Sequence, residues 1–486
     1  DVIVTNHDLG LADLALGGGA ILPAPADTLY VFDEGHHLPD KAIGHFAHYT
    51  RLRSTAEWLE QIARNLTKLL AQHPLPGDFG RLIEGIPEQA REIRAQQQFV
   101  QAACEELGDF RPGEDMEGRE RPRHRFPGGV VPEHLREMGI ELKKGFNRLT
   151  EQFTRLADIL KEAMDGDGSA GVTSYQAEEW YPLFGSLLAR AQSNWELWTA
   201  FTAEDPEDSP PMARWLTLVE NGSYHDIEVN ASPILAAETL RRHLWNAAHG
   251  ALVTSATLTA LGSFERFRMR AGLPKAAVTA VVPSPFRHAE AGLLRVPDLK
   301  ADPRDAAAHT AAIVRELPAM LDGARGSLVL FSSRKQMQDV FDGLERDWRK
   351  RVLIQGNLSK QETLNKHKAR VDDGESSVLF GLASFAEGVD LPGAYCEHVV
   401  IAKIPFAVPD DPVEAALSEW IEARGGNPFM EIAVPDASLR LIQACGRLLR
   451  TEQDSGTVSL LDRRVVTQRY GKAILNTLPP FRRQID

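Results

Sequence analysis

Thr28-Leu29-Tyr30-Val31-Phe32, an apolar run rich in β-forming residues, ends abruptly at Asp33-Glu34-Gly35-His36. A continuous apolar run of this length is typical of a strand buried on both faces, as in parallel α/β sheets. Further strand-like runs, separated by helical stretches, return from Ala251 onward. This alternation predicts βαβ units with right-handed crossovers. We therefore expect an α/β protein with parallel sheets.

The remaining pattern predicts the order of the elements. Strand-like runs occupy 251–255, 327–332, 352–354, 378–380, 399–401 and 457–461, and helical runs occupy 335–348, 360–371 and 437–449. Between about residues 50 and 210 the pattern is helical instead, over 53–70, 88–107, 133–164 and 177–201. We expect a first α/β lobe in 1–49 and 211–282, a mostly α-helical insertion in 50–210, and a second lobe in 283–486 that follows a Pro-rich linker.

Composition limits the class of protein. The chain has 486 residues and a net charge of −14, from 54 basic and 68 acidic residues. This balance argues against coating nucleic acid or an anionic membrane by bulk charge, but it allows a local basic groove. No apolar run of about 18 residues is present, so no membrane contact is expected. Cys104, Cys396 and Cys445 are far apart, which predicts buried reduced thiols rather than a disulfide framework or a close-spaced metal motif.

Two motifs follow predicted strands of the first lobe. Asp33 and Glu34 suit a nucleotide site, where the Asp holds Mg²⁺ through water and the Glu deprotonates the attacking water; the alternative is an acidic helix N-terminus. His36 could transmit the state of the bound nucleotide to a neighbouring motif. A zinc site is not expected at His36-His37, because the H-E-x-x-H spacing does not occur there. Ser255 and Thr257 could bond those carboxylates, or they could cap the next helix.

Two more motifs lie in the second lobe. In 383–393, Glu387, Gly388 and Asp390 place two carboxylates around Gly-Val, which a surface turn does not explain. On a helix, Gln443, Arg447 and Arg450 would share one face at i, i+4 and i+7. Two guanidiniums on one face suit a triphosphate, and the alternative is a solvated basic face.

The joint order of these motifs is more specific than any one of them. Asp-Glu-x-His, Ser-Ala-Thr, Glu-Gly-x-Asp and Gln-x-x-Gly-Arg-x-x-Arg resemble motifs II, III, V and VI of superfamily 2 helicases. The long helical insertion and Val4-Thr5-Asn6-His7 narrow the resemblance to DinG-type helicases, bacterial relatives of the XPD family of iron–sulfur DNA helicases. The resemblance covers essentially the whole chain and implies two RecA-like lobes and an Arch-like insertion.

The resemblance also implies roles for individual residues. Glu34 matches the catalytic base and Asp33 the Mg²⁺ carboxylate, while Gly35 replaces the usual Ala, a loss of one methyl that we expect to change little. Arg447 and Arg450 match arginine fingers. Further nucleotide-site residues are expected at His36, Ser255, Thr257, Glu387, Gly388, Asp390 and Gln443. DNA contacts are expected at Asn6, Ser332, Arg334, Arg266 and Arg268, whereas Trp180, Trp195 and Trp198 have the spacing of core residues.

By the same resemblance, the family uses ATP and Mg²⁺ to move 5′→3′ on single-stranded DNA. It unwinds forks, R-loops and D-loops in repair and replication. A monomer in the bacterial cytoplasm, associated with the nucleoid, is expected.

Two family features do not occur in the chain. It contains no G-x-x-x-x-G-K-[ST] loop and no four-cysteine cluster, and its start, Asp1-Val2-Ile3-Val4-Thr5, reads as the beginning of a buried strand. We therefore expect a carboxyl-terminal portion of a longer protein, with the 4Fe-4S cluster and the phosphate loop upstream, and little ATP hydrolysis by this portion alone. Alternatives are a binding module that uses the helicase fold without turnover, or a helicase fused to an upstream nuclease.

Overall fold

The computed structural model describes residues 2–72, 75, 77–111, 121–166, 171–221, 224–382, 385, 388–407 and 411–486. Two compact units make up the chain. Unit 1 contains Asp1–Thr28, Leu38–His249 and Pro409–Gly425, and unit 2 contains Leu29–His37, Gly250–Val408 and Gly426–Asp486. Leu29–His37 and the residues from Gly250 to Val408 thus belong to the same unit as the C-terminal sheet.

Unit 2 contains the α/β fold that the sequence predicts. Its main sheet has seven parallel strands in the order β13-β7-β12-β11-β8-β10-β9. The strands are β7 (Gly292–Val296), β8 (Gly326–Phe331), β9 (Val352–Ile354), β10 (Ser377–Leu382), β11 (His398–Ile401), β12 (Gly456–Leu460) and β13 (Arg482–Ile485). The five expected strands of this lobe are confirmed, and β7 and β13 extend the sheet beyond them.

Helices cover both faces of this sheet, so the strands can be apolar throughout. All six residues of β8 are buried, and successive side chains enter different cores. Leu328 and Leu330 join the core formed with α17 (Val434–Cys445) and α19 (Arg469–Thr477). Val329 and Phe331 join the core formed with α11 (Ala306–Met320) and α12 (Arg334–Gly343). Unit 2 also contains α9 (Glu265–Ala271), α10 (His288–Ala291), α13 (Arg346–Arg349), α14 (Lys360–Asp372) and α18 (Arg464–Thr467).

A second, two-stranded sheet in unit 2 carries the stretch that opened the sequence. β1 (Leu29–Phe32) pairs in parallel with β6 (Gly250–Val253). Tyr30 and Phe32 are buried, but Leu29 and Val31 are 65% and 60% exposed. The expectation of burial on both faces is therefore wrong for β1, because the face that carries Leu29 and Val31 is exposed in the part of the chain that the structure describes.

The expected strand at the start of the chain is also not observed. Residues 2–6 have no regular secondary structure, and the side chains of Val2 and Val4 are exposed. An extended segment becomes a strand only when a neighbour satisfies its backbone groups. The first regular element is α1 (His7–Ala15), which Asn6 caps by accepting the Leu9 N–H at 2.9 Å.

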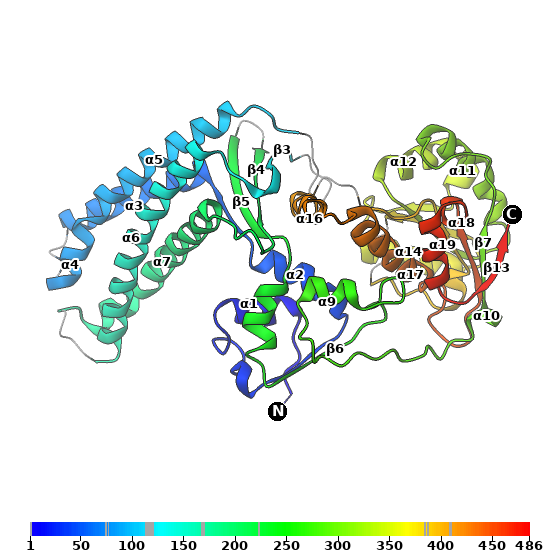
Figure 1. The fold of residues 1–486 in the computed structure, drawn as a ribbon, viewed down its shortest axis with the longest axis horizontal. Helices are drawn as coiled ribbons and strands as arrows, with labels where there is room; N and C mark the ends of the chain where they lie inside the picture. Colours follow the sequence, from blue (N-terminus) through cyan, green and yellow to red (C-terminus); the bar gives the residue numbers. More distant parts are fainter. Residues whose placement is uncertain are drawn as a thin grey trace. The chain divides into compact units, whose positions relative to one another are not determined.

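Unit 1 contains the long helices that the sequence predicts (Figure 1). They are α3 (Leu52–Gln72), α5 (Ile86–Glu106), α6 (Glu133–Met164) and α7 (Ser174–Thr202), with the shorter α4 (Gly77–Glu84). A capping box between Thr173 and Gln176 starts α7. Trp198 is fully buried and the Trp180 ring stacks on Phe79, with Trp195 packed against the same core. The expectation that these tryptophans are core residues is confirmed.

An antiparallel sheet that the sequence did not predict completes the helical part. Its order is β2-β5-β4-β3, with β2 (His48–Arg51), β3 (Arg123–Phe126), β4 (Met212–Asn221) and β5 (Tyr224–Pro233). Smaller elements of unit 1 are α2 (Leu38–His45), α8 (Ala237–Leu240) and a π-helical turn, Arg241–Trp245. None of the helices in the described residues has the length and apolar character needed to cross a bilayer.

One helix of unit 1 comes from a distant part of the chain. α16 (Pro412–Ala423) lies between β11 and α17 in sequence, yet it packs against β4 and the turn after β3. Glu419 makes the polar contacts: one carboxylate oxygen accepts from Arg125 Nη2 at 2.5 Å and the other from the Gly128 N–H at 2.7 Å. Both bonds are charge-assisted and partly buried, so they fix where α16 docks.

Glu419→Ala is expected to loosen the docking of α16. Hydrogen bonds to a charged group contribute about 1.5–3 kcal/mol, so amide exchange in 412–423 should accelerate while β8 stays protected. Glu422→Ala, an exposed carboxylate on the same helix, is the matched control. Equal exchange in the two variants, measured by mass spectrometry, would show that the Glu419 contacts do not hold the helix.

Candidate functional site

The two motif carboxylates lie at the carboxyl end of β1, in unit 2. Glu34 has a left-handed backbone with φ 49°, which is uncommon for a residue with a side chain and marks a constrained position. Its N–H donates to Asp33 Oδ1 at 3.0 Å. Both residues are exposed, and the Glu34 side chain is 63% accessible. The turn therefore presents two carboxylates to solvent at a strand end.

A chain of hydrogen bonds leads from Glu34 to α17. Ser255 Oγ donates to Glu34 Oε2 at 3.2 Å, and His36 Nδ1 lies 2.7 Å from the same Ser255 oxygen. His36 Nε2 lies 3.0 Å from the amide nitrogen of Gln443. Because the Gln443 amide donates, Nε2 accepts, and the neutral imidazole carries its proton on Nδ1 and donates it to Ser255. Every bond in the chain then has one donor and one acceptor.

Thr257 closes this network. Its N–H donates to Ser255 Oγ at 3.2 Å, and its hydroxyl oxygen accepts from Gln443 Nε2 at 3.3 Å. The alternative that Ser255 and Thr257 cap the next helix is wrong, because that helix, α9, begins only at Glu265 and has no side-chain cap. The structure thus brings together four of the predicted site residues, His36, Ser255, Thr257 and Gln443, with Glu34.

The two predicted arginine fingers are not on the helix. α17 ends at Cys445, so the expected shared face of Gln443, Arg447 and Arg450 is not formed. The two guanidiniums converge instead on one acceptor: Arg447 Nη1 and Arg450 Nη2 donate to the Val389 carbonyl at 3.1 and 2.7 Å. Gly446 ends the helix, in keeping with its low helix propensity, and so frees both arginines to turn toward the 388–393 loop.

That loop carries the third motif. Gly388 has a φ of +68°, a conformation that favours glycine. Asp390 Oδ1 lies 3.5 Å from Arg450 Nε, and its side chain is 76% exposed. Glu387 lies outside the described residues, so its predicted place in the site stays a prediction. Gly388 and Asp390 flank Val389, so this loop contacts the arginine segment through the Val389 carbonyl.

Asp454 holds the same two segments together and was missed from the sequence. It accepts the Arg450 and Thr451 N–H groups at 2.7 and 2.8 Å, and the Gly393 N–H at 3.0 Å. The Thr451 hydroxyl adds a bond of 2.6 Å. Burial opposes ionisation of Asp454, but these bonds outweigh it and lower the pKa of the carboxyl. Asp454-Ser455-Gly456 is a turn pattern, but an Asp in such a turn bonds the N–H two residues further on, so the pattern does not predict these partners.

Asp436 is a second missed residue. It lies buried at the start of α17 and pairs with Arg266 and with Arg270, the latter at 3.3 Å. Arg268 donates to the Pro274 and Ala277 carbonyls at 3.4 and 3.0 Å. Arg266 and Arg268 thus already bond protein groups within unit 2, which favours a structural part for them over the predicted DNA contact. That contact stays a prediction.

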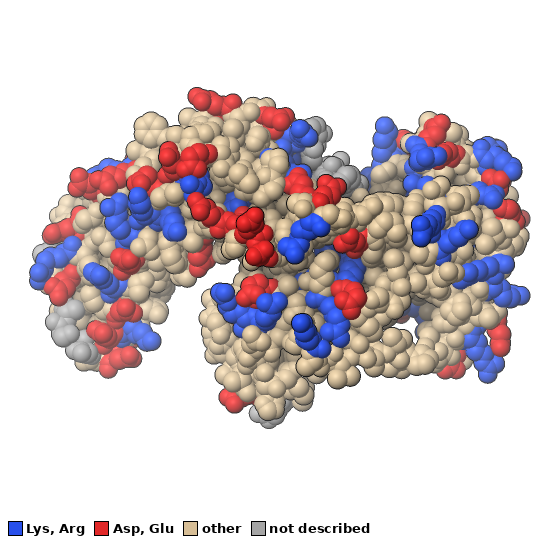
Figure 2. All heavy atoms as spheres, in the orientation of Figure 1, with Lys and Arg blue, Asp and Glu red and all other residues tan. Residues whose placement is uncertain are grey.

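The other predicted DNA contacts lie elsewhere. Ser332 and Arg334 are exposed at the carboxyl end of β8, where Ser333 caps α12. Asn6 caps α1 in unit 1. Figure 2 shows basic and acidic side chains intermixed over the face in view.

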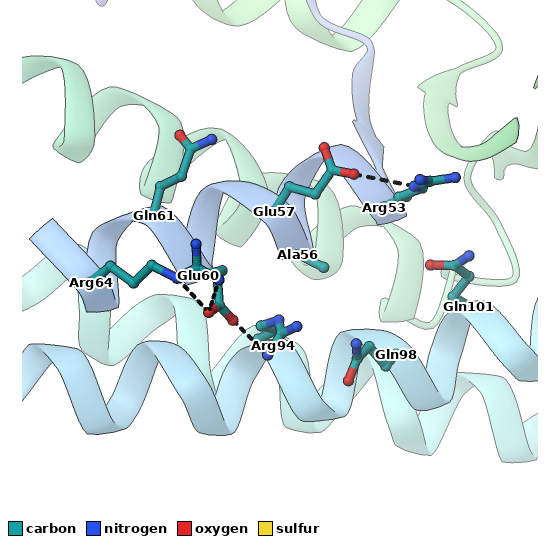
Figure 3. Close-up of a pocket in the computed structure, with 9 residues that line it drawn as sticks. All are labelled: Arg53, Ala56, Glu57, Glu60, Gln61, Arg64, Arg94, Gln98 and Gln101. Atoms are coloured by element: carbon teal, nitrogen blue, oxygen red, sulfur yellow. Dashed lines mark hydrogen bonds and ion pairs between the residues drawn. The ribbon is translucent and has the colours of Figure 1, made fainter. Parts of the chain in front are cut away.

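A polar groove of about 440 Å³ between α3 and α5 is not part of this network (Figure 3). Glu60 sits between Arg64 and Arg94, at 2.8 and 2.6 Å, and Arg53 pairs with Glu57. No predicted motif residue lines the groove. Its charges satisfy one another, as in a solvated helix surface.

Asp33 is the residue for which the sequence predicts a part in holding a metal ion. Its exposed carboxylate is a hard oxygen ligand of the kind Mg²⁺ binds together with water and phosphate oxygens. The cysteines do not fit a cluster: Cys104, Cys396 and Cys445 are free and buried, and burial raises the pKa of each thiol to about 12. The described residues hold no group of three or more potential metal ligands.

Gly35 is required by packing, contrary to the expectation that one methyl there matters little. A Cβ at this position would lie 2.2 Å from Val253 Cγ1. Val is β-branched and stiff at χ1, so it cannot swing aside freely. The Gly35 N–H also donates to the Thr254 carbonyl at 2.9 Å, which ties the two motif-bearing strand ends together.

Gly35→Ala is therefore expected to destabilise unit 2 by about 1–3 kcal/mol through overpacking, and Val253→Ala should restore much of the loss. Gly44→Ala, in α2 with nothing within 4 Å of the added methyl, is the control and should be neutral or stabilising. Urea unfolding, followed by intrinsic fluorescence, measures the stability of the parent, of Gly35→Ala with and without Val253→Ala, and of Gly44→Ala. A Gly35→Ala chain as stable as the parent would contradict the packing argument.

Asp454→Asn is expected to cost about 1–3 kcal/mol at pH 7, since an amide has one acceptor oxygen for four donors. The lowered pKa of Asp454 means that its carboxylate stabilises the fold above the unfolded value of about 4 and that this contribution is lost as pH falls through the folded pKa. The difference in Tm between the parent and Asp454→Asn should therefore become smaller as the pH is lowered. The exposed Asp373→Asn serves as control, and a pH-independent gap would argue against an ionised Asp454.

Comparison with known proteins agrees with this geometry. Residues 319–481 match the family of helicase C-terminal domains. The chain is 36% identical over 496 residues to the ATP-dependent DNA helicase DinG of Photobacterium profundum, covering 100% of the chain and 69% of that relative. It is 32% identical to the Escherichia coli K12 protein of the same name, covering 99% of the chain and 66% of that relative.

The chain thus spans about two thirds of the length of these relatives. Among solved structures, Xpd4 of S. tokodaii is similar at 14% identity with a TM-score of 0.49, covering 95% of the chain and 77% of that protein. The motifs occur in the expected order, and over the full length of this chain 36% of the aligned residues are identical to those of a protein of that name. The chain therefore belongs to the family of DinG ATP-dependent DNA helicases.

Proposed function

We propose that the intact protein uses ATP hydrolysis to move 5′→3′ along single-stranded DNA and to unwind forked, R-loop and D-loop structures in repair and replication. The observation that carries the proposal is the hydrogen-bonded chain from Glu34 through Ser255 and His36 to Gln443. It links the carboxylate expected to act on water with the helix that precedes the arginines. A monomer acting on such DNA is the simplest form of the proposal.

Glu34 is the proposed general base. Its carboxylate accepts a proton from the water that attacks the terminal phosphate, while the Ser255 hydroxyl, 3.2 Å away, orients the receiving oxygen. Asp33 would hold Mg²⁺ through water, and the ion when bound neutralises phosphate charge. The His36 imidazole donates to Ser255 through Nδ1 and accepts from Gln443 through Nε2. A change at Glu34 is therefore transmitted through Ser255 and the His36 ring to Gln443.

Arg447 and Arg450 are the proposed arginine fingers. Both guanidiniums now bond the Val389 carbonyl, a neutral acceptor. Phosphate oxygens would be stronger, charged acceptors, so arrival of a triphosphate would draw the two side chains from that carbonyl. Release of Val389 would loosen the 388–390 part of the loop, while Gly393 stays bound to Asp454. In this proposal the loop senses both nucleotide and DNA.

The DNA strand is proposed to contact Ser332 and Arg334, which are exposed at the carboxyl end of β8. Asn6 is a further proposed contact. Because the net charge is −14, the strand must follow a local path rather than a generally basic surface. The iron–sulfur cluster of the resemblance would have to come from outside these residues, since their three thiols do not fit it.

A second candidate is a module that binds nucleic acid without turnover. The chain has no G-x-x-x-x-G-K-[ST] loop, which is the observation that favours it for these residues taken alone. A binding module has little need for a base and two arginines, which favours the helicase for the intact protein.

In the intact protein, Glu34→Gln is expected to keep DNA binding and to lose unwinding, because an amide can hold the Ser255 hydrogen bond but cannot take a proton. ATP hydrolysis should fall at least about a hundredfold. Fluorescence unwinding of a forked duplex and anisotropy with single-stranded DNA measure the two properties. Retained unwinding would exclude Glu34 as the base, and DNA binding without any ATP turnover in the parent would favour the second candidate.

A further inference from the structure

Asp436, in the first turn of α17, is a buried carboxylate that the proposed mechanism does not use. Asp436 is 7% exposed, and Arg270, which donates to it from Nη2 at 3.3 Å, is 2% exposed. Arg266 donates to the other carboxylate oxygen through Nε. Arg266 and Arg270 are four positions apart on α9, so they lie on the same face of that helix. The three side chains, which we call the Asp436 cluster, thus join the first turn of α17 to one face of α9.

Asp436 and Gln443 lie on the same face of α17. They are separated by nearly two full helical turns, which is about 10 Å along the axis. Near the end of the helix, the Gln443 amide nitrogen lies 3.0 Å from His36 and donates to Thr257 at 3.3 Å. One helix therefore contacts α9 at its first turn and the network of strand-end residues near its last turn. Because a helix is stiff over this length, the Asp436 cluster helps to set whether Gln443 reaches His36.

The apolar cores on the two faces of the seven-stranded sheet do not include the strands that carry the first two motifs. Among the described residues, none from β1, β6 or α9 belongs to either core, although Leu261, in the turn before α9, is partly buried against one of them. A sheet of only two strands is not stable by itself, so β1 and β6 depend on their neighbours. A polar joint can open and close again, because its charged groups regain hydration when they separate, whereas opening an apolar core exposes hydrocarbon to water.

We propose that Asp436 is a positioning residue for ATP hydrolysis, whose ion pairs with Arg266 and Arg270 form a latch that holds α17 where Gln443 bonds His36. The inference rests on the proposed function in taking ATP as the ligand, and it adds a residue that none of the four motifs contains. Removal of one partner from a buried ion pair leaves the other charge uncompensated, so the latch opens. Fewer molecules then have the assembled network, and ATP must bind to a smaller competent fraction.

ATP itself is expected to favour the latched form. In the proposed function the triphosphate contacts both the Glu34 end of β1 and the arginines that follow α17, so it binds best when these two parts are held together. A ligand that prefers one form shifts the population toward that form. Saturating ATP should therefore restore the assembled network in a chain that lacks the latch.

Hydrogen exchange of the full chain, measured by mass spectrometry without nucleotide, tests the latch itself. In Asp436→Asn, the amides of 29–35 and 250–254 should exchange at least about tenfold faster, a low figure for the loss of one partner of a buried ion pair. The amides of β8 should exchange as in the parent. Glu265→Gln, which changes an exposed carboxylate on α9, is the control and should have no effect. Unchanged exchange in 29–35 and 250–254, or an equal acceleration in β8, would overturn the inference.

A second variant guards against a chain that fails to fold. Arg266→Gln removes a less buried partner, with a side chain that is 16% exposed, and it should loosen the same two regions more mildly. In the double variant with Asp436→Asn, the acceleration should be smaller than the product of the two single effects, because both changes break one interaction. Independent effects that multiply would show that Asp436 and Arg266 do not act as a pair.

ATP turnover by the intact protein gives an independent readout. Asp436→Asn should raise the KM for ATP at least about fivefold. It should keep kcat within about twofold of the parent, a split that a general loss of stability does not produce. A lower kcat with an unchanged KM would overturn the inference and leave the proposed function standing. An intact parent that hydrolyses no ATP would overturn the proposed function and with it the part of Asp436 in hydrolysis, whereas the exchange results would still decide whether Asp436 holds the strand ends.

Discussion

The contact between Gln443 and His36 is the interaction on which the site depends. It joins residues 407 positions apart at 3.0 Å, and it brings α17 against the strand ends that carry Glu34 and Ser255. Asp436, at the other end of α17, pairs with Arg266 and Arg270. With both ends of one helix anchored in this way, the motif residues near β1 and β6 belong to the same compact unit as the seven-stranded sheet.

A second set of bonds positions the arginines without using the helix. Val389 accepts both guanidiniums through one carbonyl, and Asp454 binds the backbone on both sides of the contact. A neutral carbonyl is a weak competitor for a guanidinium, whereas a buried carboxylate with four donors is a firm anchor. The arrangement therefore keeps the backbone of the arginine segment fixed while its side chains can exchange acceptors.

Much of the fold could be read from periodicity. The strands β8 to β12 and the helices α3, α5, α6, α7 and α14 fall where the apolar patterns predict them, because burial imposes a spacing on the residues themselves. The pattern missed the β2-β5-β4-β3 sheet, whose strands come from three separate parts of the chain. It also placed Arg447 and Arg450 on a helix that stops at Cys445, since the end of a helix depends on what its last turn can bond.

The sequence by itself determined the class of the protein and the kind of residues in its site, because motif order and spacing are properties of the chain. It could not decide which partners those residues choose. That His36 bonds Ser255 and Gln443, that Asp454 rather than a helix face positions the arginines, and that Gly35 must lack a side chain beside Val253 all depend on contacts between distant segments. Such contacts exist only after packing has excluded water and fixed distances, so tertiary structure alone decided them.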